Sequence, residues 1–402
     1  MAGIASTWRP TARKHTSMAP GAILRVTALL RFILLVAGAA TATATAARFS
    51  RLFSFGDSLT DTGNLVLLPA GRDVPERRLP YGQTFFHRAT GRASDGRIAI
   101  DFIAEALELP RLKPYLAGEG ADGFRHGANF AVGGATARDA GFFQRRGLRS
   151  VPVSLATEMG WFKELLPLLA SSCPQEQRKI TASSLFFVGE MGGNDYLNAI
   201  FQNRTLDEAK TFVPGIIDAI RSSLAELIGV GAKTVLVQGM LPIGCEPRVL
   251  ELFKLKHGRS TAGDDSDYDA ATGCLKSFNE LAEQHNRALT AALDELRRAH
   301  PGTAIVYADL YRAVTDIAVS PRRYGFGGEP LFACCGGGGG PYNVRLAARC
   351  GDEGTAACGE PSEYVSWDGI HYTEAANRVI ARGIVEGRYT VPPISLSVSS
   401  SD

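Results

Sequence analysis

Serine, histidine and aspartate side chains occur in two short motifs whose residue types fit the chemistry of acyl transfer. Ser58 lies in Phe55-Gly-Asp-Ser-Leu59, at the end of a short apolar run. A serine hydroxyl is a poor nucleophile until a base removes its proton and a third group orients that base. Asp368 and His371, in Asp-Gly-Ile-His, provide the acid and the base three residues apart. The motifs therefore predict a triad of Ser58 as nucleophile, His371 as base and Asp368 as orienting acid.

Three hydrogen-bond donors are expected beside Ser58, because the carbonyl oxygen of a substrate becomes negatively charged during acyl transfer. The first is the backbone N–H of Ser58, and the second is a glycine N–H in residues 129–135, Asn-Phe-Ala-Val-Gly-Gly-Ala. The third is the side-chain amide of Asn194 in Gly-Gly-Asn-Asp. Each motif alone also fits an ordinary turn, a strand-to-helix loop or the start of a helix. Their combination, with these segments placed after predicted strands, indicates one site at one edge of a sheet.

The elements that would position these residues alternate between short apolar strands and amphipathic helices. Five buried strands are predicted: Arg51–Phe55, Ala128–Val132, Leu185–Val188, Thr234–Val237 and Ala304–Tyr307. Apolar residues at spacings of three and four predict helices in 98–107, 206–228 and 275–293. This alternation predicts an α/β fold with a mostly parallel sheet and helices on both faces. No linker divides residues 48–392, so we expect one domain there, followed by a flexible tail over 393–402.

The first 47 residues have the order of a signal peptide. Basic residues precede the apolar run Phe32–Ala40, and small residues follow it up to Ala47. The apolar run is shorter than the roughly 20 residues that span a membrane, so no stable membrane span is expected. An uncleaved Golgi-type anchor and a first core helix are the alternatives. A signal peptide over 1–47 predicts a protein of the secretory pathway.

All seven cysteines follow this segment, as expected for an oxidising compartment. Four of them cluster in 334–358 and suggest two local disulfides, and a bridge between Cys245 and Cys274 would leave Cys173 free. The spacing does not determine the connectivity. The same stretch contains the run Gly336–Gly340. It is interpreted either as part of a flexible, disulfide-tethered wall of the active site or as a solvent loop.

The charge balance and the missing motifs restrict the class of protein. The chain has 43 basic and 41 acidic side chains, whereas nucleic-acid binding needs a concentrated basic surface, so no nucleic-acid partner is expected. A two-metal phosphoesterase, which also uses motifs of the Gly-Gly-Asn-Asp kind, would need a histidine-rich ligand set that is missing. We therefore expect no metal and no cofactor. An α/β-hydrolase would show the motif Gly-x-Ser-x-Gly, which this sequence lacks. A non-catalytic binding descendant of the esterase fold would have lost a triad residue, whereas all three are present here.

Four motifs together resemble those of the plant GDSL (SGNH) esterases and lipases. In chain order they are Phe55-Gly-Asp-Ser-Leu-Thr-Asp-Thr-Gly-Asn64, Asn129-Phe-Ala-Val-Gly-Gly-Ala135, Gly189-Glu-Met-Gly-Gly-Asn-Asp195 and Trp367-Asp-Gly-Ile-His371. The resemblance covers residues 48–392. It implies an SGNH hydrolase domain with a flavodoxin-like three-layer α/β/α sandwich around a five-stranded parallel sheet, and a mechanism without a metal.

The resemblance also implies a role for each residue of the site. The triad falls on the three residues named above, the oxyanion asparagine on Asn194 and the oxyanion glycine on Gly134, with Gly133 as the nearest rival. A histidine base predicts activity that rises with pH as His371 loses its proton. The expected midpoint is near the ordinary histidine pKa of about 6.5.

Segments 188–196 and 333–343 resemble the branch that contains sinapine esterase, acetylajmalan esterase and acetylcholinesterase-like plant members. Related plant enzymes remove acetyl groups from xylan in the Golgi. The resemblance implies a serine carboxylic-ester hydrolase for short acyl esters, chiefly acetyl, of a small molecule or a cell-wall polysaccharide such as acetylated xylan. The alternative is an acyltransferase or a lipase that uses the same acyl-enzyme. We expect an extracellular, cell-wall or Golgi-lumen location and a glycan on Asn203, in the one sequon.

Overall fold

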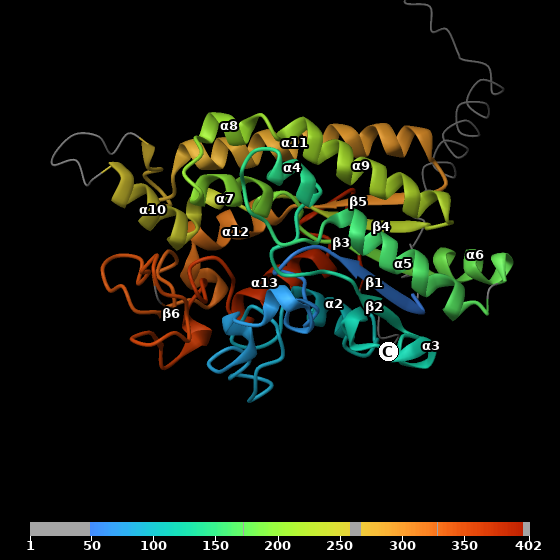
Figure 1. Ribbon diagram of the computed structural model, residues 1–402, viewed down its shortest axis with the longest axis horizontal. Helices are drawn as coiled ribbons and strands as arrows, with labels where there is room; N and C mark the ends of the chain where they lie inside the picture. The colour runs from blue at the N-terminus through green and yellow to red at the C-terminus, as the bar shows by residue number, and fades with distance from the viewer. Residues whose placement is uncertain (1–48, 172, 258–266, 328, 397–402) are drawn as a thin grey trace, which may run out of the picture. The chain divides into compact units, whose positions relative to one another are not determined.

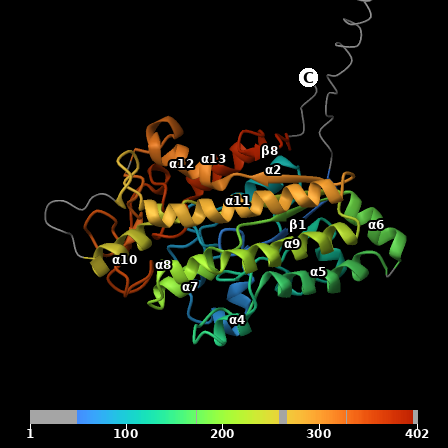
Figure 2. The ribbon, with the colours of Figure 1, turned by 90° about the horizontal axis from the view of Figure 1, so that it is seen from above.

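A central sheet lies between two groups of helices (Figures 1 and 2). The computed structural model describes residues 49–171, 173–257, 267–327 and 329–396. The predicted signal peptide, residues 1–47, lies outside the described residues. The observed layers confirm the predicted α/β class with helices on both faces of the sheet.

Five parallel strands form most of the sheet: β1 Arg51–Phe55, β2 Gly127–Asn129, β3 Ser184–Val188, β4 Thr234–Gln238 and β5 Ala304–Ala308. Their order in space is β2-β1-β3-β4-β5. The chain runs from β1 to β2 on one side and then crosses to β3 on the other side of β1. Ligands of open α/β sheets bind where the strand order reverses in this way, outside the carboxyl end of the strand. Ser58 follows the carboxyl end of β1.

The sheet differs from the prediction in two places. Strand β2 ends at Asn129, although the N–H groups of Phe130 and Val132 still donate to the carbonyls of β1 and the turn after it. The chain turns there toward the two glycines at 133 and 134. A sixth strand, β8 Thr390–Val391, pairs antiparallel with β5 at the edge of the sheet. Two residues are too few to produce a recognisable strand pattern, because strands are usually 3–10 residues long.

Helices cover both faces of the sheet. One face carries α5 Leu155–Leu169, α9 Val213–Gly229 and α11 Lys276–Ala299, and the other carries α2 Ala99–Ala106, α12 Leu310–Val319 and α13 Glu374–Val385 (Figure 2). The other helices of the described residues are α3 Gly120–Gly123, α4 Ala140–Gln144, α6 Pro174–Ala182, α7 Gly193–Phe201, α8 Leu206–Lys210 and α10 Pro247–His257.

The helix predicted over 206–228 is two helices, α8 and α9. Pro214 lies in the first turn of α9, where its missing N–H costs no helical hydrogen bond. A helix start at this proline therefore separates the two segments. In α11, by contrast, Phe278, Leu281, Leu289 and Leu293 are all buried, as their spacing predicts.

Aromatic side chains hold the end of β1 in a fixed position. Phe53 and Phe55 are fully buried, and their rings contact those of Phe130 and Phe162. The ring centroids of Phe55 and Phe130 are 5.1 Å apart, and those of Phe53 and Phe162 are 5.2 Å apart. Truncating a buried phenylalanine to alanine costs about 3–5 kcal/mol, so the end of β1 is a strongly stabilised platform for the turn that follows it.

Three disulfides stabilise the loops at one end of the sheet. They join Cys245 to Cys274, Cys334 to Cys358 and Cys335 to Cys350, and Cys173 is free and exposed. These bridges confirm the prediction of two local disulfides in 334–358 and a third between Cys245 and Cys274, with Cys173 free. Strands β6 Cys335–Gly336 and β7 Ala356–Ala357 form a two-stranded antiparallel sheet within the bridged segment.

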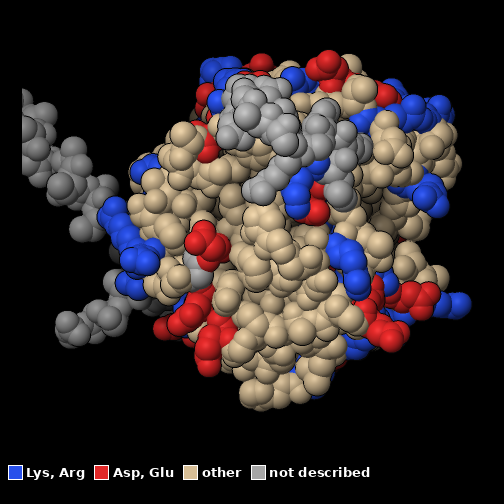
Figure 3. All heavy atoms as spheres, turned by 90° about the vertical axis from the view of Figure 1, so that its left-hand side faces the viewer, with Lys and Arg blue, Asp and Glu red and all other residues tan. Residues whose placement is uncertain are grey.

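The surface at this end of the molecule carries charges of both signs. On the face that includes α10 and the bridged loops, acidic and basic side chains lie around a broad uncharged area and form no single basic patch (Figure 3). Among the described residues, no helix combines the length and the apolar character needed to cross a membrane. Leu396, within the predicted tail, is buried, and its N–H donates to the carbonyl of Val385. The packed chain therefore reaches at least Leu396, and residues 397–402 lie outside the described residues.

Candidate active site

A tight turn after β1 presents Ser58. Gly56 has φ of +140°, and a Cβ atom there would lie 3.2 Å from the Cα of Gly189. Asp57 accepts the N–H of Leu59 on its Oδ1 at 2.9 Å, which closes the turn over Ser58. Gly56 and Asp57 are therefore needed for the geometry of the turn, and they leave the Ser58 side chain partly exposed at the carboxyl end of β1.

Ser58, His371 and Asp368 form a continuous chain of hydrogen bonds. The Oγ of Ser58 lies 2.8 Å from Nε2 of His371, and Nδ1 of His371 lies 2.7 Å from Oδ2 of Asp368. The other oxygen of Asp368 accepts the backbone N–H groups of Ile370 and His371 at 3.0 and 2.9 Å. The Asp-x-x-His spacing thus folds the carboxylate back over its own loop, which orients the imidazole toward Ser58.

Tyr81 is a further member of this chain of hydrogen bonds, and the sequence analysis missed it. Its hydroxyl donates to Oδ2 of Asp368 at 2.7 Å, the same oxygen that contacts His371. The ring is buried and packs edge-on against Trp367, with centroids 5.8 Å apart. Tyr81 lies 287 residues from Asp368 in an irregular segment, so no local pattern could have indicated the contact.

The charges of His371 and Asp368 stabilise each other. Burial disfavours the charged imidazole, but the charge and hydrogen bond of Asp368, with the nearby Glu76 and Asp57 carboxylates, together outweigh burial and raise the pKa of His371 to about 9. In the same way, the charge and hydrogen bonds of His371 overcome burial and lower the pKa of Asp368. The structure therefore places the His371 midpoint well above the ordinary histidine value expected from the sequence. A base with a raised pKa is a stronger proton acceptor once it is neutral.

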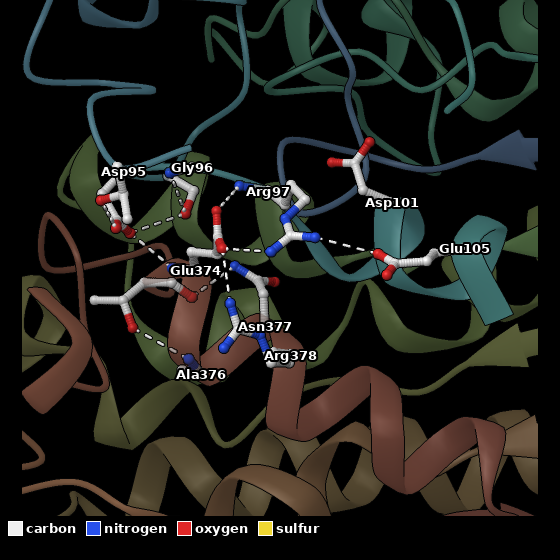
Figure 4. Close-up of polar contacts among 12 residues, drawn as sticks. Asp95, Gly96, Arg97, Asp101, Glu105, Glu374, Ala376, Asn377 and Arg378 are labelled. Carbon is white, nitrogen blue, oxygen red and sulfur yellow. Dashed lines mark hydrogen bonds and ion pairs between the residues drawn. The ribbon is translucent and has the colours of Figure 1, made fainter. Parts of the chain in front are cut away.

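The start of α13 anchors the loop that carries His371, through contacts of Asp95 and Arg97 with Glu374 that Figure 4 shows. Thr373 caps this helix, and Oδ1 of Asp95 accepts the N–H of Glu374 at 2.7 Å. The carboxylate of Glu374 is buried and pairs with Arg97 at 2.8 Å. Asp95 and Arg97 thus clamp the start of α13, three residues after His371, and they were not predicted to take part in the site.

Gly134 is the better placed of the two candidate oxyanion glycines. The N–H of Gly133 donates to Oδ2 of Asp61 at 2.8 Å and is therefore occupied. Among the described residues, the N–H groups of Gly134 and Ser58 have no acceptor. Gly134 has φ of +81°, and a Cβ atom there would lie 2.6 Å from Val151. The positive φ and the close contact require glycine at this position.

Asn194 lies in the first turn of α7, next to the Ser58 turn. Its amide nitrogen donates to Oδ2 of Asp57 at 2.9 Å and to the carbonyl of Ala135 at 3.1 Å. Both amide protons are therefore engaged by protein oxygens, and a substrate oxygen would have to share or displace one of these acceptors. The contact also gives Asp57 a second task, since it holds the Asn194 side chain beside Ser58.

Several acidic side chains are buried behind the site. Burial raises the pKa of Asp57 to about 6 and that of Asp195 to about 7. It also raises the pKa of Glu190 and Glu246 well above the ordinary value. Asp195 accepts the N–H groups of residues 137 and 138, which ties the Gly134 loop to α7. Asp195, with Glu190, which accepts the N–H of Gly193 at 2.9 Å, therefore holds the loops of the site in place by accepting backbone N–H groups.

A cavity of about 270 Å³ adjoins Asp368 and His371. Its walls include Arg349 and Cys350, so the disulfide between residues 335 and 350 tethers one side of the cavity. This agrees with the predicted wall of the active site. The run Gly336–Gly340 is not among the lining residues, and its last four glycines are exposed.

Two other residues, His285 and Asn203, take no part in the hydrogen bonds of the Ser58 site. His285 is buried in α11 beside the hydroxyl of Tyr196 at 3.0 Å, and burial lowers its pKa to about 3. It is therefore a neutral packing residue. Asn203, the predicted glycan acceptor, is exposed in the turn after α7, where a glycan would have space.

Comparisons with known proteins identify the family. The sequence model of the GDSL-like lipase/acylhydrolases matches residues 52–384. The chain is 44% identical to GDSL esterase/lipase At1g28570 of Arabidopsis thaliana over 88% of this chain and 89% of that protein. It is 42% identical to sinapine esterase of Brassica napus over 87% and 88% of the two chains. A solved acetyl-xylooligosaccharide esterase from Geobacillus is 12% identical, with a TM-score of 0.38 over 85% of this chain and 94% of that one. The chain belongs to the GDSL esterase/lipase family of ester hydrolases.

Proposed function

We propose that the protein hydrolyses short acyl esters through a Ser58 acyl-enzyme. Ser58 Oγ attacks the carbonyl carbon while Nε2 of His371 takes its proton, and Asp368 stabilises the imidazolium that forms. The negative oxygen accepts hydrogen bonds from the N–H groups of Ser58 and Gly134 and from Asn194. The imidazolium then protonates the departing alcohol. Water repeats the cycle and releases the acid and free Ser58.

The observation that carries the proposal is the unbroken chain from Ser58 through His371 to Asp368, with contacts of 2.8 and 2.7 Å. The N–H groups of Ser58 and Gly134 have no acceptor among the described residues, so they are available to a substrate oxygen. The likeness to sinapine esterase supports ester hydrolysis, and the N-terminal pattern of residues 1–47 and the three disulfides support a secretory location.

The proposal is tested with Ser58→Ala and a fluorophosphonate probe, which labels only an activated serine. We expect the variant to lose both hydrolysis of p-nitrophenyl acetate and labelling, because no other residue of the site can form the acyl-enzyme. Cys173→Ser, which changes an exposed free thiol, is the matched control and should retain both. Turnover by Ser58→Ala at the wild-type rate would disprove the proposed mechanism.

A substrate series defines the acyl group. We expect kcat/KM to fall as the acyl chain of p-nitrophenyl esters lengthens from acetate to decanoate. A rise over the same series would favour a lipase and would contradict the short-acyl part of the proposal.

A further inference from the structure

We infer that Glu158 is a positioning residue that fixes the separation between two of the proposed oxyanion donors, the N–H groups of Ser58 and Gly134. The inference rests on the proposed function, because it concerns how these donors are held for that reaction. Glu158 lies close to the start of α5, and its side chain is fully buried. It acts on the backbone that carries the donors and not on the reacting atoms.

The carboxyl group of Glu158 holds the chain where β1 ends. Its Oε2 atom accepts the N–H of Gly56 at 2.9 Å, across 102 residues of sequence. The carbonyl of Gly56 accepts the N–H of Val132 at 3.1 Å. Gly56 lies two residues before Ser58, and Val132 lies two residues before Gly134. Both polar groups of Gly56 are therefore bonded, one to α5 and the other to the segment that leads to the oxyanion glycine.

The start of α5 also holds the Gly134 loop directly. The N–H of Leu155 donates to the carbonyl of Thr136 at 2.9 Å, and the N–H of Thr136 donates to the carbonyl of Val153 at 3.3 Å. Glu158 follows Leu155 by three residues in the same helix, and the backbone of a helix has a fixed geometry. One rigid support therefore carries both segments, and loss of the Glu158 contact would release the end of β1 from it.

Burial favours the neutral form of Glu158. It raises the pKa of this carboxyl well above the ordinary value, and the charges of Asp61 and Asp57 add to the effect, although the backbone N–H groups of Gly56 and Val132 oppose it. A neutral carboxyl group retains an oxygen that accepts a hydrogen bond, and so does an amide. Glutamine therefore reproduces the contact with Gly56, whereas aspartate is too short and methionine has no oxygen.

The contact with Gly56, and not a gain in stability, accounts for a carboxyl group at this position. The Oε1 atom of Glu158 is buried with no hydrogen-bond partner in the described part of the chain. A buried polar atom without a partner costs stability. The same face of α5 buries Leu155, Met159 and Phe162, so an apolar side chain would suit the packing better. The carboxyl group provides what an apolar side chain lacks, an acceptor for the N–H of Gly56.

The first test compares Glu158→Met with Glu158→Gln on p-nitrophenyl acetate. Rates are expressed per active site, counted by fluorophosphonate labelling carried to completion, so a loss of folded protein does not enter them. We expect kcat to fall by about tenfold or more in Glu158→Met, because small displacements of groups that act in the transition state have large effects on rate. Glu158→Gln should stay within about threefold of the wild type, because its amide oxygen accepts the same N–H.

Two further variants complete the series. Glu158→Asp keeps the carboxyl group but withdraws it from Gly56, so it should show the loss of Glu158→Met and covers the case in which that variant does not fold. Glu164→Met is the matched control on the same helix, since its exposed carboxylate accepts the hydroxyl of Tyr115 at 3.1 Å, away from Gly56. This control should leave kcat unchanged.

A trifluoromethyl ketone gives a second readout that a purely structural role would not change. Ser58 adds to its carbonyl group, and the oxygen of the adduct takes the place of the oxyanion. Because such an adduct resembles the transition state, its Ki should rise in Glu158→Met by about the factor by which kcat/KM falls. In Glu158→Gln and Glu164→Met the Ki should stay near the wild-type value.

Two results would overturn the inference. One is a kcat per active site within about threefold of the wild type in both Glu158→Met and Glu158→Asp, which would limit Glu158 to a role in folding. The other is Glu158→Gln as impaired as Glu158→Met, because the acceptor for Gly56 would then not be what matters. Failure of the proposed function has a different signature, since Ser58→Ala would then still hydrolyse p-nitrophenyl acetate.

Discussion

At the scale of single residues, the aspartate of the Gly-Asp-Ser turn does more than shape the turn. Oδ1 of Asp57 closes the turn on Leu59, and its Oδ2 holds the amide of Asn194. One buried carboxylate thus links the proposed nucleophile to a proposed oxyanion donor. The arrangement fixes the direction of the Asn194 side chain before a substrate arrives, which lowers the reorganisation needed in the transition state.

Asn194→Ala tests whether this amide stabilises the oxyanion. We expect kcat to fall by about 10²–10³ if one amide proton moves from its protein acceptor to the substrate oxygen. Asn198→Ala, one turn later on the same helix, is the matched control and should leave kcat near the wild-type value. A loss smaller than about tenfold would assign Asn194 to holding Asp57 and Ala135 in place.

Tyr81→Phe tests the part that the phenol plays in tuning His371. The hydroxyl shares Oδ2 of Asp368 with the imidazole and helps to lower the pKa of this carboxyl. Without it, the carboxylate interacts more strongly with the imidazolium, and the pKa of His371 rises further. Since only neutral His371 accepts a proton, the rising limb of kcat/KM against pH should move to higher pH.

The wild-type limb itself should lie above the ordinary histidine value of about 6.5, because Asp368 already raises the pKa of His371. Tyr311→Phe is the control, since its hydroxyl donates to Glu283 at 2.9 Å. This variant should keep the wild-type profile. A Tyr81→Phe enzyme with reduced turnover but an unshifted profile would show that Tyr81 has only a packing role.

At the scale of elements, His371 depends on two helices that are far apart in sequence. The clamp of Asp95, Arg97 and Glu374 joins the segment before α2 to the first turn of α13. The N–H of Arg97 also donates to Glu374, at 2.9 Å. Because the clamp lies just after the loop that carries His371, movement of α13 would change the distance between His371 and Ser58. The position of His371 relative to Ser58 therefore depends on the contact between the segment before α2 and the start of α13.

Glu374→Ala should destabilise the protein and impair turnover together. Removing one member of a buried ion pair costs about 3–5 kcal/mol, because the remaining charge is left buried without its partner. We expect a loss near 3 kcal/mol in urea unfolding, since Arg97 retains an outer partner in Glu105 at 3.1 Å. Arg378→Ala removes only the exposed partner of Glu374 and should cost less than about 1 kcal/mol. Equal losses in the two variants would contradict a role for the clamp.

At the scale of the whole molecule, the disulfides hold the long loops against the edge of the sheet. The segment between β5 and α13 has little regular structure beyond α12, yet it supplies one wall of the cavity and then Asp368 and His371. Two of its bridges close loops with sequence separations of 24 and 15 residues. Cross-links of this size limit the unfolded chain and keep a loop-rich wall in place at small cost.

Replacing Cys335 and Cys350 by serine tests this role. We expect a loss of about 3 kcal/mol in unfolding free energy, the chain-entropy value for a 15-residue loop. The wall would also become less ordered, so KM for p-nitrophenyl acetate should rise more than kcat falls. Cys173→Ser should change neither quantity. An unchanged KM in the double variant would separate the bridge from substrate binding.

Sequence patterns predicted the α/β class, the five parallel strands and the residues that meet at Ser58, because these features depend on short-range signals. Hydrophobic period indicates strands and helices, and parallel strands bring their carboxyl ends to one edge. The Asp-x-x-His spacing is short enough for the Asp368 carboxylate to fold back over its own loop and reach His371, so this contact could be predicted from the sequence. The two-residue strand β8 and the break between α8 and α9 were missed, because neither changes the local hydrophobic pattern.

Only the tertiary structure revealed the long-range contacts that hold the residues of the candidate site in place and the residues that line the cavity beside it. Tyr81 meets Asp368 across 287 residues, and Arg97 meets Glu374 across 277. Glu76 and Arg248 come from separate segments of the chain and line the same cavity. The path of the whole chain brings such partners together, so the sequence around each residue carries no signal for the contact. The sequence alone determined which residues could perform acyl transfer at Ser58, and the folded chain decided what surrounds them.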